Sequence, residues 1–182
     1  RASMKKIDIV TMGVDKTANS PVIFLRIENT NLIVPIWIGP WEASVLASAI
    51  KEEASDRPLT HDMIMSMLEH TGYRISHVAI NDFKKNIYYA KVFLSVEDEV
   101  QDNLKGEEEV FIDSRPSDAI ILAVKSKTSI FIEDSVAFET AIDGSFLKID
   151  DDEQTKKEDI KKFIDTFNID DLKKKFGEDP KK

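Results

Sequence analysis

The sequence predicts an α+β fold: a mixed β-sheet with helices packed on it, in the order βββααβββαβ, followed by a C-terminal helical tail. Strand-like segments come in runs joined by short turns, and helix-like segments fall between the runs, which is the α+β arrangement. The composition changes at Asp150, where a densely charged stretch begins. We therefore expect one domain over residues 4–149, then a charged linker and an amphipathic helical tail over residues 150–182.

The first run contains three predicted strands. The segments "KIDIVTMGVD" and "PVIFLRIE" alternate apolar and polar residues, which indicates half-buried strands. The third segment, "LIVPIWIG", is apolar throughout, as in a strand that is covered on both faces. A proline cannot donate to a strand ladder, so Pro35 places this third strand at an edge of the sheet or at a bulge.

Two helices are predicted next. Gly39-Pro40 opens the first, because proline is tolerated in a first turn. Thr60 is a suitable N-cap for the second, and Gly72 is a suitable stop. Trp37 and Trp41, on either side of Gly39-Pro40, are expected to be core anchors rather than base-stacking platforms. The expected buried stripe of the second helix consists of Met63, Ile64, Met67 and Leu68.

The second half predicts a hairpin, another strand, a helix and a last strand. "YRISHVAIND" and "NIYYAKVFLSV" form the hairpin, and "EEVFIDS" forms the strand that follows it. The helix is expected from about Ser117 to Lys127, because Ala119 to Val124 are apolar without interruption. "SIFIED" is the last strand. We expect at least five strands and three main helices in total.

Composition excludes several classes of protein. The 182 residues contain no cysteine, which removes disulfides, thiolate metal sites and a cysteine nucleophile and makes a cytoplasmic location the default. No apolar run approaches the roughly 18 residues of a membrane span, so no membrane association is expected. The net charge is −9. Affinity for nucleic acid rests on cationic side chains, so such binding would need a local cationic cluster or a bound cation.

Two Arg-Pro segments, "RPLTHDM" and "IDSRPSDAIILAV", each stand at the start of a predicted helix. In one interpretation, Thr60 and either Ser114 or Ser117 cap these helices. Asp62 and Asp118 would then lie in the first turns, where a carboxylate is favourable to the helix dipole. Capping alone gives the two arginines no role.

The second interpretation is an anion site. An arginine beside the N–H groups of a helix N-terminus offers a bidentate fork for phosphate. We expect Arg57 and Arg115 to share a cleft and bind phosphate, together with Thr60 and Ser117. Both interpretations can hold at once.

Four acidic residues are candidate metal ligands: Glu42, Asp62, Asp113 and Asp118. They fall near predicted helix starts or strand ends, and Mg²⁺ or Mn²⁺ prefers such oxygen ligands. Two such ions can clamp a phosphodiester during hydrolysis. His61 is the candidate for proton transfer, because an imidazole titrates near neutral pH. Glu42, Asp62 and Asp118 complete the candidate catalytic set.

Motifs for other chemistries are missing from the sequence. A histidine-rich metal site is disfavoured, because only His70 and His77 accompany His61. The sequence also lacks a dinucleotide-binding glycine motif, a phosphate-binding loop, a serine nucleophile elbow and a metalloprotease motif. No organic cofactor is expected.

Three segments in order, "LIVPIWIGPWEASVLASAI", "RPLTHDMIMSML" and "IDSRPSDAIILAV", resemble the bifunctional nuclease domain family over about Met4 to Ile149. The resemblance implies an α+β domain, often dimeric, with nuclease activity on DNA and RNA. The positions that match the family's motifs are Trp37, Ile38, Gly39, Glu42 and Ala43 in the first segment, Arg57, Pro58, Thr60, His61 and Asp62 in the second, and Asp113, Arg115, Pro116, Ser117, Asp118 and Ala119 in the third.

Two functional hypotheses follow. The first is a metal-assisted nuclease whose arginines hold phosphate at helix N-termini. The second is a non-catalytic binding or regulatory module in which the motifs are structural; the acidic charge and the lack of a strong catalytic signature favour it. We also expect a homodimer built mainly by residues 4–149. The apolar stripe from Ile160 to Phe176 would dock on its own domain, on a second subunit or on another partner.

Overall fold

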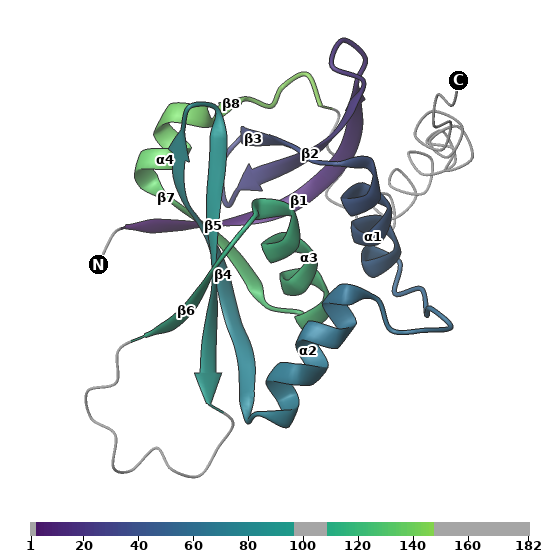
Figure 1. Ribbon diagram of the computed structural model, residues 1–182. Coiled ribbons are helices and arrows are strands. Elements are labelled where there is room, and N and C mark those ends of the chain that lie inside the picture. The colour runs from purple at the N-terminus through teal and green to yellow at the C-terminus, as the bar shows by residue number, and fades with distance from the viewer. Residues whose placement is uncertain (1–2, 97–108, 148–182) are drawn as a thin grey trace, which may run out of the picture.

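One mixed sheet of eight strands dominates the computed structural model, which describes residues 3–96 and 109–147 (Figure 1). The strands lie in the order β6-β5-β4-β7-β1-β2-β3-β8. In chain order the elements are β1 Met4–Asp15, β2 Ser20–Ile27, β3 Leu32–Trp37, α1 Pro40–Ile50, α2 Thr60–His70, β4 Tyr73–Lys84, β5 Ile87–Val96, β6 Val110–Ser114, α3 Pro116–Ser126, β7 Ser129–Glu133, α4 Asp134–Thr140 and β8 Ile142–Asp143. The predicted α+β fold is confirmed.

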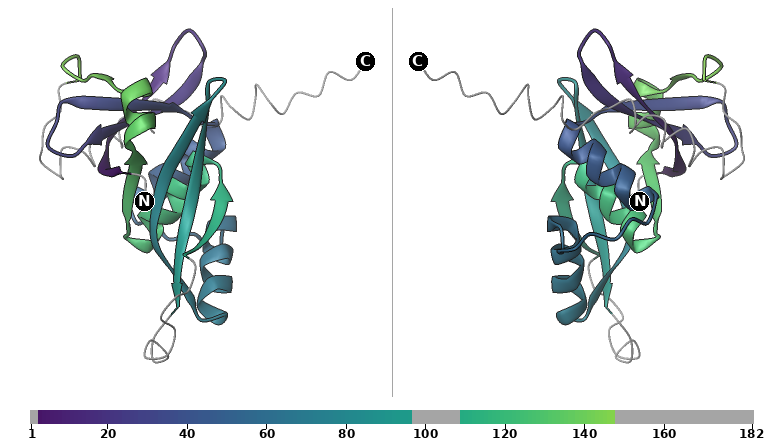
Figure 2. Two further views of the ribbon diagram at one scale, coloured as in Figure 1. Left: turned by 90° about the vertical axis from the view of Figure 1, so that its left-hand side faces the viewer. Right: turned by 90° about the vertical axis from the view of Figure 1, so that its right-hand side faces the viewer.

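The sheet is mixed because its two hairpin-linked parts meet along a parallel pair. β4 and β7 run parallel, with Val78 opposite Ile130, whereas the other neighbouring strands are antiparallel. Three consecutive β4 residues, Val78 to Ile80, are buried, so both faces of the sheet are covered there. On one side lie α1, α2 and α3, as the views in Figure 2 show.

Helix α3 is the centre of the core. Ala119 to Ala123 are all buried, and α3 packs against α1, α2 and the strands β4, β5 and β7. A helix that is surrounded in this way needs an apolar residue at every position, which explains the uninterrupted apolar run in the sequence. The predicted helix is confirmed. It begins at Pro116 and ends at Ser126, and Lys127 caps it in the left-handed conformation with φ 56°.

The sheet curls until strands that are distant in the strand order meet. The hydroxyl of Tyr88 on β5 donates to the carbonyl of Pro35 on β3 at 3.1 Å, although four strands separate β5 from β3 in the sheet. The right-handed twist between neighbouring strands allows such closure. As a result, the tip of the β4–β5 hairpin lies against the end of β3.

Two elements were not expected from the sequence. Helix α4 follows β7 directly and buries Val136 and Ala137. Strand β8 contributes two residues and pairs with Leu32 and Ile33 on β3. Pro35 lies beyond that short pairing, so its predicted position at a sheet edge is confirmed. Seven and two residues are too few to give a periodic signal in the sequence.

The predicted helix caps are wrong. The N-cap of α2 is Leu59 rather than Thr60, and the N-cap of α3 is Arg115 rather than Ser114 or Ser117. No side chain at either N-cap position forms a capping hydrogen bond. Cap positions can shift by a residue without any change in the apolar pattern, and the sequence therefore fixed them poorly.

The predicted burial of several large side chains is also wrong. Trp37 and Trp41 are 51% and 55% exposed, so neither is a core anchor. On α2, Ile64 and Leu68 pack on the core, whereas Met63 and Met67 are exposed. The helix contacts the core along a stripe of Ile64, Met65 and Leu68, and Met63 and Met67 lie outside that stripe.

No helix in the described part of the chain is long and apolar enough to cross a membrane. The cytoplasmic location stays a prediction. The predicted linker and tail, residues 150–182, lie outside the described residues, and so does the question of what the tail contacts.

Replacing Ile121 by alanine should lower the free energy of unfolding by about 2–5 kcal/mol, because this fully buried residue at the middle of α3 would leave a cavity. Denaturant unfolding measures the change. The matched control is Phe138→Ala on α4, where the side chain is 93% exposed and the expected change is within about 0.5 kcal/mol. Equal effects of the two substitutions would contradict this description of the core.

The predicted homodimer has a candidate interface at β6. This strand ends the sheet and exposes Val110, Phe111 and Ile112, and an exposed apolar edge strand readily pairs with another strand. We expect β6 to pair with β6 of a second copy about a twofold axis. Light scattering should show a dimer that Ile112→Lys dissociates. Ile142→Lys, at the opposite end of the sheet, should leave it intact. A monomeric unmodified chain at tens of micromolar would contradict the dimer.

Candidate functional site: an arginine–carboxylate network beside a groove

The three longer helices start in the same way, with an acidic residue at the third helical position. These residues are Glu42 on α1, Asp62 on α2 and Asp118 on α3. A carboxylate there is favourable to the positive end of the helix dipole and can accept a hydrogen bond from the N-cap backbone. The shared position has a different use in each helix.

Asp62 serves α2. Its Oδ2 accepts from the backbone N–H of Leu59 at 2.8 Å, and its Oδ1 accepts from Lys125 Nζ of α3 at 2.7 Å. The hydrogen bond from Lys125, followed by the one from Leu59, lowers the pKa of Asp62 below its usual value. The capping interpretation therefore explains Asp62, which also ties α2 to α3.

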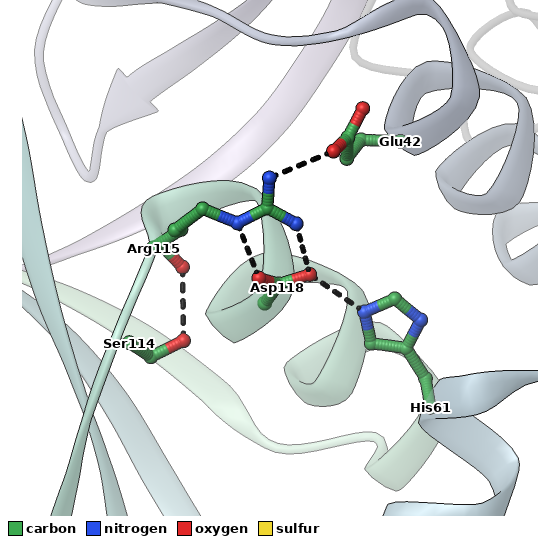
Figure 3. A network of polar contacts seen from close by, with 5 residues as sticks. All are labelled: Glu42, His61, Ser114, Arg115 and Asp118. Carbon is green, nitrogen blue, oxygen red and sulfur yellow. Dashed lines mark hydrogen bonds and ion pairs between the residues drawn. The ribbon is translucent and has the colours of Figure 1, made fainter.

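Arg115 joins the other two carboxylates. Its Nε and Nη2 donate to the two oxygens of Asp118 at 2.7 and 3.1 Å, and its Nη1 donates to Glu42 Oε1 at 2.9 Å (Figure 3). The bidentate pair with Asp118 fixes the plane of the guanidinium. The side chain of Arg115 is nevertheless 64% exposed. It therefore links the N-termini of α1 and α3 while remaining open to solvent.

His61 contacts Asp118 on the side opposite Arg115 (Figure 3). Its Nε2 donates to Asp118 Oδ1 at 3.0 Å, and the ring is buried. Figure 3 shows Asp118 between the imidazole and the guanidinium of Arg115. His61 comes from α2, so all three helix N-termini meet in one polar network of Glu42, His61, Arg115 and Asp118.

Asp118 is ionised in this network. Burial alone would raise the pKa of its carboxyl, but the hydrogen bonds from Arg115 and His61 outweigh burial and lower the pKa below its usual value. Hydrogen bonds to Asp118 and Glu42 raise the pKa of Arg115 still further above neutrality. In this network one guanidinium faces two carboxylates.

A groove of about 380 Å³ lies beside the network, where the curled sheet brings β3 close to β5. Its walls come from the end of β3, the starts of α1 and α3, and the tip of the β4–β5 hairpin. The lining residues are Ile36, Trp37, Ile38, Gly39, Glu42, Asn86, Ile87, Tyr88, Arg115, Pro116 and Ser117. The groove is mostly apolar, and the charged groups of Arg115 and Glu42 belong to its wall.

Gly39 makes room for Glu42. A Cβ added at Gly39 would lie 2.1 Å from Glu42 Oε2, so any larger residue would displace that carboxylate. The backbone of Gly39 is extended, with φ −71°, and other residues can adopt it. The glycine is therefore required by the close approach of the carboxylate rather than by backbone conformation.

The structure brings together Glu42, His61, Arg115 and Asp118, with Ser117 buried in the groove wall. Arg57 and Thr60 are exposed, and neither belongs to the network or to the groove lining among the residues described. The expected cleft shared by Arg57 and Arg115 is therefore not supported, because the loop before α2 runs outside the groove.

The candidate metal ligands separate in the same way. Asp113 is exposed on β6, where it pairs in register with Lys91. Asp62 already accepts a hydrogen bond from Lys125. Within residues 3–96 and 109–147, no three histidine, aspartate or glutamate side chains are grouped closely enough to hold a metal ion. Glu42 and Asp118 are the two candidates that face a common position, now filled by the guanidinium of Arg115.

Sequence reasoning missed the hairpin tip, Asn86 to Tyr88, and it assigned Trp37 to the core. No local signal places that hairpin at the site, because the curl of the sheet creates the contact. Trp37 carried a usable signal: a bulky aromatic residue at the end of a strand, two residues before a Gly-Pro helix start, lies where the chain turns outward.

Fold and site together define an α+β domain whose functional candidate is an arginine–carboxylate network at converging helix N-termini. The model of the bifunctional nuclease domain matches residues 23–145, a stretch that contains the whole network. The chain belongs to the bifunctional nuclease domain family.

Similar proteins occur in Mycobacterium tuberculosis and in plants. An uncharacterized protein of Mycobacterium tuberculosis is 28% identical over 177 residues, which cover 93% of this chain and 99% of that protein. Bifunctional nuclease 2 of Oryza sativa subsp. japonica is 32% identical over 131 residues, 71% of this chain and 38% of the rice protein. Bifunctional nuclease 1 of Arabidopsis thaliana is 30% identical over 122 residues, which cover 66% of this chain and 36% of the Arabidopsis protein. The chain thus spans little more than a third of these plant proteins.

Acid should destabilise the domain through Asp62 and Asp118. The pKa values of both carboxyls are lowered in the folded state. Their contribution to the free energy of unfolding is therefore present above the ordinary carboxyl pKa and is lost as pH falls through the lowered values. Thermal unfolding followed by circular dichroism should show a falling Tm from about pH 5 downward. Asp118→Asn should flatten that dependence, whereas Asp8→Asn, at an exposed position of β1, should not. An unchanged slope in Asp118→Asn would contradict the assignment.

Proposed function

We propose that this chain is a nuclease that hydrolyses phosphodiester bonds of DNA or RNA, with the scissile phosphate held by Arg115. The observation that carries the proposal is an exposed guanidinium, oriented by a bidentate carboxylate, at the rim of an open groove. Membership of the bifunctional nuclease domain family and the names of the plant relatives support the class of reaction.

Phosphate binding would use both the arginine and the helix. Arg115 is the N-cap of α3, and the first N–H groups of a helix have no partner within the helix. Ser117 would then contribute its backbone N–H rather than its buried hydroxyl. Arg57, which is exposed before α2, would contact another phosphate farther along the nucleic-acid strand.

Charge supports a role for a divalent cation. A phosphodiester adds a negative charge beside two carboxylates that already share one guanidinium, so a further positive charge would favour its binding. We propose Mg²⁺ or Mn²⁺ at Glu42 and Asp118, on carboxylate lone pairs that Arg115 does not use. Mg²⁺ is often bound by only one or two protein carboxylates, with water and substrate phosphate as the other ligands, and the pair fits that requirement. Such an ion lowers the pKa of bound water and stabilises developing charge.

The chain's own residues would divide the remaining work. Glu42 would accept a proton from the attacking water, whose oxygen bonds to phosphorus as the bond to the leaving oxygen breaks. That proton finally reaches the leaving oxygen. Arg115 would stabilise the charge that develops on the phosphoryl oxygens. Since Asp118 separates His61 from Arg115, we propose that His61 positions Asp118 rather than transferring a proton directly.

A non-catalytic binding module is the second candidate. One observation favours it: each carboxylate of the site is already paired with a cationic side chain, Arg115 or Lys125. In that case the domain would bind nucleic acid or another anion at Arg115 without cleaving it.

A cleavage assay separates the two candidates. Protein stripped with EDTA should cleave labelled DNA or RNA only after Mg²⁺ or Mn²⁺ is added. Arg115→Ala should reduce the rate by about a hundredfold or more, the usual effect of removing a group that stabilises transition-state charge. Glu42→Gln should also reduce it by about a hundredfold or more, because it removes the proton acceptor. Arg74→Ala, an exposed arginine of β4 outside the groove lining, is the matched control and should keep full activity.

Cleavage that persists in Arg115→Ala would indicate a contaminating nuclease and end the proposal. Binding that depends on Arg115 in the absence of cleavage under every metal condition would establish the second candidate instead.

A further inference from the structure

The groove has an exposed tryptophan at its rim. Trp37 is the last residue of β3, it lines the groove, and 51% of it is exposed. An exposed indole forgoes the large gain from burying an aromatic ring. Such a ring needs a reason to be held in place.

The indole is held in place by a built contact. Trp37 Nε1 donates to Asp15 Oδ2 at 2.9 Å. The other oxygen, Asp15 Oδ1, accepts from the backbone N–H groups of Thr17 and Ala18 at 2.9 and 3.0 Å. The β1–β2 turn thus fixes the carboxylate, and the carboxylate fixes one edge of the ring. Both faces of the indole remain free of any ring contact among the described residues.

The groove combines this ring with a cation. Ile87 and Tyr88 line it together with Trp37, and Arg115 belongs to the same lining. The volume of about 380 Å³ falls within the 300–1,000 Å³ or so that small-molecule sites occupy. A ligand that fits has a flat apolar part for the indole and an anionic part for the guanidinium. A nucleotide has both.

We propose that Trp37 is a base-stacking residue: a nucleotide whose phosphate contacts Arg115 places its base against the indole. The inference rests on the proposed function for the phosphate contact and adds the substrate class to it. In a duplex each base is already stacked between its neighbours. The groove therefore selects single-stranded nucleic acid, whose bases stack readily on aromatic side chains.

Fluorescence gives a direct test, because the chain contains only two tryptophans. In Trp41→Phe, Trp37 is the sole tryptophan and reports on its own contacts. A short oligothymidylate in Ca²⁺ should quench its emission. A duplex of the same length should quench it far less, and so should an abasic deoxyribose-phosphate oligomer with the same charge. Equal quenching by the abasic oligomer or by the duplex would overturn the proposal.

Substitutions at position 37 test the energetics. Base stacking contributes about 1–3 kcal/mol, so Trp37→Ala should raise Kd for the oligothymidylate by about fivefold to a hundredfold or more. Trp37→Phe, which retains a ring, should recover most of the affinity. Trp41→Ala is the matched control, since Trp41 is equally exposed but does not line the groove. Thermal unfolding of each variant checks that the fold is kept.

The outcomes distinguish this proposal from the proposed nuclease activity. If Trp37→Ala binds and cleaves like the unmodified chain while Arg115→Ala is inactive, the proposal that Trp37 stacks on a base is wrong. The proposed nuclease activity is then still supported. If oligothymidylate binding depends on Trp37 but no metal supports cleavage, stacking is correct and the hydrolytic function is wrong.

Discussion

The bidentate pairing of Arg115 with Asp118 is the interaction on which the site depends. Through it and the added bonds to Glu42 and His61, the first turns of three helices that are far apart in the sequence are held together. Exposed ion pairs contribute little to stability, so the main effect of this pair is to position the guanidinium of Arg115. It keeps a guanidinium oriented and open to solvent at the rim of the groove.

The position of the network follows from the packing of α3. Its central turns are buried on every side, so the helix cannot rotate or slide without moving apolar side chains out of the core. Its first turn is consequently a rigid support for Arg115 and Asp118. Proline at the first helical position of both α1 and α3 adds stiffness at the same place. Polar groups on such supports lose little entropy when they bind a ligand.

The acidic charge of the chain and its proposed substrate can be reconciled locally. Three cationic side chains of α1 and α3 are each paired with an acid: Arg115 at the start of α3, Lys125 in its last turn and Lys51 at the end of α1. Because these three cations are already paired, affinity for a phosphate backbone at the site would come from few contacts. The oriented arginine, the proposed divalent cation and the proposed aromatic surface for a base would be three such contacts, and each would act without a broad positive field.

The sequence by itself determined the α+β class, the main strands and helices, the buried character of α3 and the residue types at the helix starts. These depend on local periodicity and on proline and glycine chemistry, which a single sequence displays. Tertiary structure alone decided which helix starts meet. Asp118 pairs with Arg115 three residues earlier, which is a local contact, but its second partner is His61 of α2, and Asp62 pairs with Lys125 of α3. Only the path of α2 across α3 determines these two long-range partners. It also decided that Trp37 is exposed, since the curl of the sheet, a sum of small twists over many strands, creates the groove at which it stands.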